Sequence, residues 1–143
     1  MNDIARADYV LWVAGVGNDT PGPGGWAAIV TVGATDHTYS VASAGDDYTT
    51  VAQTEAAAIL AALARIPQRA TVAVVVRADT IERLGPGAGS GEAGNALAAL
   101  QAARDTCSKA SICGWIDIDS FPPHHPNVME ARFLAGIAMG EIS

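Results

Sequence analysis

The pattern of apolar and polar positions divides the chain into short strands and longer helices. Five runs are either rich in β-branched and aromatic residues or alternate between apolar and polar side chains, and both patterns are typical of strands. These runs are Tyr9–Val13, Trp26–Val32, His37–Ser43, Thr71–Val76 and Ser111–Ser120. The fourth is apolar almost throughout, which predicts a strand that is buried on both faces of a sheet.

Three further segments favour helices, because they combine strong helix formers with apolar residues at helical spacing. They are Glu55–Ile66, Glu92–Asp105 and Val128–Met139. The apolar stripe of the first consists of Ile59, Leu60, Leu63 and Ile66. We expect Thr54 to cap this helix and Pro67 to end it. In the last helix, the side chains expected in the core are Phe133, Leu134 and Ile137.

The order of these elements is three strands, helix, strand, helix, strand, helix. Strands in sequence followed by alternating helices and strands predict an α/β arrangement, in which helices flank a five-stranded mixed sheet. The 143 residues suit a single domain, residues 1–143, and the glycine-rich stretch at 85–91 is too short to separate two. Because no long apolar run and no secretion signal are evident, we expect a cytoplasmic protein that does not enter a membrane.

The net charge of the chain bears on whether it binds nucleic acid. The net charge is −7, and the basic residues are a single lysine and seven arginines. Proteins that hold nucleic acid by its phosphates gather Lys and Arg on one face, so this composition argues against a strong patch of that kind. The two cysteines, Cys107 and Cys113, are too few for a zinc site or a disulfide framework, and we interpret both as reduced thiols.

Four segments carry motifs in an order that points to a known family. They are TPGPGGWAAIV after the first strand, TTVAQTEAAAILAAL at the first helix, VAVVVRADT at the fourth strand and HHPNVMEARFLAGIAM at the end. Over nearly its full length the chain thereby resembles a type 1 ribonuclease H. The resemblance implies the ribonuclease H-like fold, with the element order β-β-β-α-β-α-β-α.

In that family four carboxylates bind two Mg²⁺ ions, which activate water and stabilise the leaving oxygen. The resemblance implies that Glu55 and Asp79 are retained acids, catalytic and metal-binding if any activity remains. It places Ala14 at the first acid position and Arg132 at the last, and neither side chain can ligate a cation. We expect Glu55 and Asp79 to pair with Arg132 in a salt-bridged cluster that replaces the metals, in preference to binding one Mg²⁺ weakly.

Other positions of the family's site have also changed. The resemblance places Val51 and Ala52 where the family has the asparagines that read the minor groove of the hybrid. Asp119 shares a face with Asp117 on the last predicted strand and is a candidate for a relocated acid, although a solvent-facing acid is the simpler interpretation. His124, in the last loop, is a candidate proton shuttle or metal ligand, and an exposed loop histidine is again simpler.

These losses favour a ribonuclease H-like protein that no longer hydrolyses RNA by two metals and acts as a binding or interaction module, with no cofactor. The alternative is a divergent, active Mg/Mn-dependent endoribonuclease. It would cleave the RNA of RNA/DNA hybrids, or structured RNA, with Glu55, Asp79 and Asp119. The partners that we expect are a weakly bound hybrid or RNA, another protein, or a second copy of the chain.

Overall fold

The computed structural model describes residues 7–18, 20–33, 37–66, 70–84 and 111–140. Its elements are β1 (Tyr9–Val16), β2 (Gly22–Val32), β3 (Thr38–Thr49), α1 (Val51–Leu63), β4 (Thr71–Val76), α2 (Ala78–Leu84), β5 (Ser111–Asp117), the 3₁₀ turn η2 (Ile118–Ser120) and α4 (Pro126–Gly140). The predicted helix over Glu92–Asp105 lies outside the described residues.

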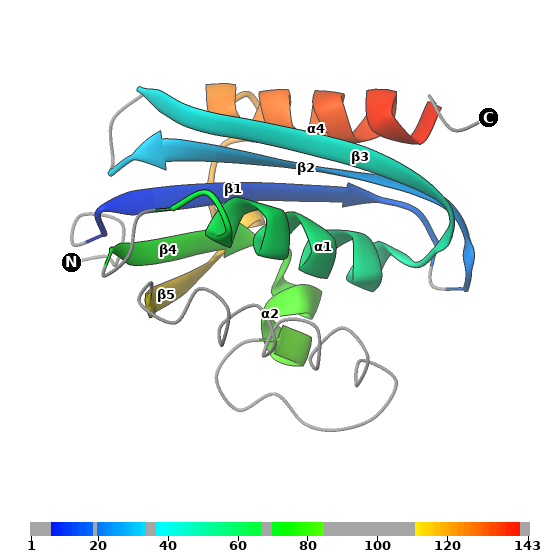
Figure 1. The fold of residues 1–143 in the computed structure, drawn as a ribbon, viewed down its shortest axis with the longest axis horizontal. Coiled ribbons are helices and arrows are strands. Elements are labelled where there is room, and N and C mark those ends of the chain that lie inside the picture. The colour runs from blue at the N-terminus through cyan, green and yellow to red at the C-terminus, as the bar shows by residue number, and fades with distance from the viewer. Residues whose placement is uncertain (1–6, 19, 34–36, 67–69, 85–110, 141–143) are drawn as a thin grey trace.

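The strands form one five-stranded sheet in the order β3-β2-β1-β4-β5 (Figure 1). The pairs β1–β2 and β2–β3 are antiparallel, and the pairs β1–β4 and β4–β5 are parallel. The predicted mixed sheet is therefore confirmed. Trp12 of β1 lies opposite Val75 of β4, so the carboxyl ends of these two central strands meet at the same edge of the sheet.

Helices α1 and α4 cover opposite faces of the sheet, as the side chains of β1 show. Alternate residues of a strand point to opposite sides of the sheet. Leu11 and Val13 of β1 belong to the core beneath α1, together with Ile59. Trp12, between them in sequence, belongs to the core beneath α4, together with Val128. None of the helices in the described ranges is long and apolar enough to cross a membrane.

Helix α1 begins one turn earlier than the sequence pattern predicted. Its N-cap is Thr50, whose side chain accepts a hydrogen bond from the backbone of Gln53, while the Gln53 side chain accepts one from the backbone of Thr50. The predicted cap, Thr54, instead lies inside the helix, where its buried hydroxyl donates to the carbonyl of Val51. This reciprocal capping box decides where the helix starts.

Helix α4 packs on the sheet with small residues. Its buried side chains are Val128, Ala131, Ala135 and Ala138. The prediction that Phe133 and Ile137 face the core is wrong, since they are 64% and 43% exposed, and Leu134 alone of the three is partly buried. Alanines let the helix approach closely: a side chain on Gly25 of β2 would come within 2.5 Å of the backbone of α4.

Because the large side chains of α4 face solvent, Phe133→Ser should change the free energy of unfolding by less than about 0.5 kcal/mol. The matched core substitution on the same helix, Val128→Ala, should lower it by about 2 kcal/mol through lost burial and a cavity. Urea denaturation of both variants measures the difference. A larger loss for Phe133→Ser than for Val128→Ala would contradict this packing.

Candidate functional site

The candidate site lies at the edge where the carboxyl ends of β1 and β4 meet. Glu55, in the second turn of α1, faces the sheet at this edge and is completely buried. Gly15 of β1 makes room for it: a side chain there would approach within 2.8 Å of Cγ of Glu55 and closer still to the hydroxyl of Thr54. Glu55 is therefore held in the interior by the close contact of β1 with α1.

Arg77, the residue that follows β4, neutralises Glu55. Its Nε donates to Oε2 of Glu55 at 2.9 Å, and its Nη2 donates to Oε1, also at 2.9 Å. The hydroxyl of Thr80, on α2, donates to Oε1 as well. Both carboxylate oxygens of Glu55 thus accept hydrogen bonds. Two of these hydrogen bonds come from the planar guanidinium of Arg77, which stays charged at any physiological pH.

Asp79, the second predicted acid, lies nearby but in a different environment. It occupies the first turn of the short helix α2 and its side chain is 66% exposed. Nη1 of Arg77 lies 3.8 Å from its Oδ2, the distance of a loose ion pair. The structure therefore brings Glu55 and Asp79 to the same guanidinium, one tightly bound and buried, the other loosely paired at the surface.

The predicted cluster of Glu55 and Asp79 with Arg132 is wrong. Arg132 is on α4, on the other side of the sheet from α1, and its Nη2 donates to Oδ1 of Asp119 at 3.0 Å. Both members of this pair are largely exposed, at 44% and 71%. The arginine beside the acids is Arg77.

Asp119 is not on a strand, contrary to the sequence prediction. Strand β5 ends at Asp117, whose carboxylate accepts a hydrogen bond from the backbone of Asp119 at 2.9 Å and starts the turn η2. The two acids are thus cap and capped residue of one turn, and they do not share the face of a strand. Asp119 lies in the salt bridge to Arg132.

The two histidines of the last loop differ in their surroundings, and Ala14 lies in the core. His124 is exposed. Its neighbour His125 stacks on Trp12 with ring centroids 4.7 Å apart, and its Nδ1 accepts from the backbone of Asn127. Ala14 of β1 lies opposite Ala27 of β2, and is buried in the core beneath α4.

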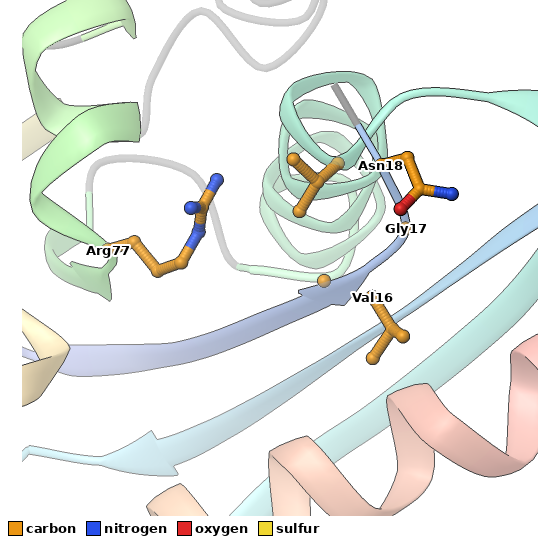
Figure 2. Close-up of a pocket in the computed structure, with 6 residues that line it drawn as sticks. Val16, Gly17, Asn18 and Arg77 are labelled. Atoms are coloured by element: carbon orange, nitrogen blue, oxygen red, sulfur yellow. The ribbon is translucent and has the colours of Figure 1, made fainter. Parts of the chain in front are cut away.

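A shallow pocket of about 420 Å³ opens beside this edge (Figure 2). It is lined by Gly15, Val16, Gly17, Asn18, Val51 and Arg77. Figure 2 shows Arg77 reaching toward it from one side and Asn18 lying on the other. The carbonyl of Asn18 accepts from the backbone of Val51 at 3.0 Å, which fixes the turn after β1 against the start of α1.

The donors at this edge do not fit a two-metal centre. The carboxylate of Glu55 is engaged by Arg77 and Thr80, and position 14 supplies only a methyl group. A cation at Glu55 would have to displace a bidentate guanidinium from a buried carboxylate. Among the residues that the structure describes, no three His, Cys, Asp or Glu side chains come together as a set that could hold a metal ion.

Neither a protein-family model nor a curated protein matches the sequence. Solved structures do match the fold. An N-terminal RNase H domain from Mycobacterium tuberculosis, solved as a fusion with maltose binding protein, has a TM-score of 0.71 at 17% identity over 94% of this chain and 95% of its own. RNase H1 from the halophilic archaeon Halobacterium salinarum has a TM-score of 0.67 at 18% identity, over 93% and 98%.

LC11-RNase H1, solved in complex with an RNA/DNA hybrid, is a third structure of this kind. Its TM-score is 0.68 at 16% identity, over 94% of this chain and 98% of its own. The chain therefore has the ribonuclease H-like fold, as its motifs predicted.

Sequence reasoning missed Arg77 and Thr80. A signal was present: Arg77 is a charged residue directly after the apolar run Thr71–Val76, two positions before Asp79. A fixed cation at the end of a buried strand needs a partner, and the acids of the same edge are the nearest candidates in the topology.

Gly15→Ala should lower the free energy of unfolding by about 1–3 kcal/mol, because the added methyl group overlaps Thr54 and the stem of Glu55. Gly22→Ala is the control, since a methyl group there meets nothing within 4 Å. Thermal and urea unfolding of the two variants test the prediction. Equal stability of both would show that β1 and α1 do not make this contact.

Proposed function

We propose that the chain is a ribonuclease H-like module that does not hydrolyse RNA through two metal ions and acts by binding. The observation that carries the proposal is the bidentate pairing of Arg77 with the buried Glu55. The buried acid at this edge already has its counter-charge, supplied by a guanidinium that does not lose its proton.

The two other changed positions support the same conclusion. At position 14 an alanine is packed into the core, so no carboxylate comes from β1. At position 132, on α4, an arginine forms a salt bridge with Asp119. The relocated-acid alternative therefore needs Asp119 to leave Arg132 and Glu55 to leave Arg77 before either could ligate a cation.

The partner class that the fold favours is an RNA/DNA hybrid or RNA, bound weakly. LC11-RNase H1, which shares the fold, is bound to such a hybrid. In this chain the pocket beside the site is lined by Val51, which offers no side-chain hydrogen bond to a base edge or a 2′-hydroxyl. The net charge of −7 also opposes binding to phosphates. A protein partner or a second copy remains the other binding mode.

Incubation with labelled RNA/DNA hybrid and double-stranded RNA, in MgCl₂ and in MnCl₂, tests the proposal. We expect no cleavage above a protein-free control, together with weak, salt-sensitive binding in a fluorescence anisotropy titration. Cleavage that disappears in Glu55→Ala and in Asp79→Ala would contradict the proposal and support the divergent ribonuclease. Glu82→Ala, an exposed acid on the same helix as Asp79, is the matched control and should change nothing.

A further inference from the structure

We propose that Arg77 takes the structural place of a divalent cation, so that removing its charge converts Glu55 and Asp79 into a site for Mg²⁺ or Mn²⁺. This inference rests on the proposed function, since it explains how a ribonuclease H-like fold holds a buried acid at this edge without metal. It goes further, because it assigns the guanidinium a role in the stability of the fold.

Arg77 lies between the carboxylates of two helices. One planar group contacts carboxylates from two helices: Nε and Nη2 bind Glu55 of α1 at 2.9 Å, and Nη1 lies 3.8 Å from Oδ2 of Asp79 of α2. Carboxylate oxygens are the donors that Mg²⁺ and Mn²⁺ prefer. A dication in the place of the guanidinium would be held by the same two side chains once they move closer to it, since Mg²⁺ binds oxygen at about 2.1 Å.

The burial of Glu55 makes a counter-charge obligatory. Its side chain is 0% exposed, and an ionised carboxylate without a partner is strongly unfavourable in the interior. In the native chain the guanidinium of Arg77 supplies this counter-charge, because it does not lose its proton. When Arg77 is made neutral, the carboxylate of Glu55 is compensated either by a proton or by a cation from solution, and the response to divalent salt distinguishes the two.

The Arg132–Asp119 pair shows that this property belongs to the site and not to ion pairs of the chain in general. That pair has a contact of similar length, 3.0 Å, but both side chains are largely exposed. Water solvates either charge when the other is removed, so no demand for a cation arises. Arg132→Gln is consequently the matched control for Arg77→Gln.

Thermal unfolding of the full chain in MgCl₂ or MnCl₂, against NaCl of equal ionic strength, tests the proposal. Arg77→Gln should lower Tm by about 10 °C in NaCl. The divalent salt should restore roughly 3–6 °C to this variant. The wild type and Arg132→Gln should respond by less than about 1 °C. Calorimetric titration should show saturable Mn²⁺ uptake by Arg77→Gln alone.

A double variant separates charge from shape. Glu55→Gln with Arg77→Gln removes the buried charge, so it should recover stability relative to Arg77→Gln and lose the response to divalent ions. If Arg77→Gln is unfolded in NaCl, circular dichroism should show that Mn²⁺ refolds it. A variant that stays unfolded in Mn²⁺, or that folds without any divalent response, would overturn the proposal.

The failure of this inference is distinct from failure of the proposed function. Cleavage by the wild-type chain would contradict the proposed function. Absence of a divalent response in Arg77→Gln, with a wild type that does not cleave, would contradict only the substitution of Arg77 for a cation.

Discussion

The interaction on which this edge of the structure depends is the ion pair between Arg77 and the buried carboxylate of Glu55. It joins α1 to the end of β4, and Thr80 extends the network to α2. A carboxylate with no exposure is tolerated only when its charge is matched and its oxygens accept hydrogen bonds, and here both conditions are met by the protein itself. The chemistry that the edge can perform follows from this pairing.

Small residues make the pairing geometrically feasible. Gly15 lets β1 approach α1 where Glu55 enters the interior, and Gly25 does the same for β2 beneath α4. The buried faces of both helices are rich in alanine. The result is a sheet closely packed between α1 and α4, in which the buried charge of Glu55 needs a specific partner.

The strands were predictable because their segments are apolar runs or alternate between apolar and polar residues, and an apolar run indicates a strand buried on both faces. The failures have physical causes. Phe133 was assigned to the core as a large apolar residue of the predicted helix, whereas the alanines of α4 face the sheet and let the helix approach it closely. Asp119 was assigned to a strand by alternation, but the carboxylate of Asp117 caps a turn that ends the strand first.

The proximity of Glu55 and Asp79 was predictable from the sequence, whereas the cation between them was not, and their role as site residues stays a prediction. The motif around Glu55 and Asp79 identified both acids, and the structure places them at one edge. The choice of Arg132 as their partner followed from family position alone, and a sequence position does not tell which face of the sheet a side chain reaches. The sequence marks Arg77 as a charge at the end of a buried strand, and the parallel pairing of β1 with β4 then places that strand end at the edge where Glu55 lies.

The most direct test is nuclear magnetic resonance of the arginine Nε–H groups in nitrogen-15-labelled protein, with Arg77 assigned by comparison with Arg77→Lys. We expect one Nε–H signal from Arg77 that exchanges slowly with water and does not move when MgCl₂ is added. A signal that exchanges rapidly would mean that the pairing does not persist, and one that shifts and broadens with Mg²⁺ would mean that Glu55 is available to metal. Either result would contradict the pairing of Arg77 with Glu55.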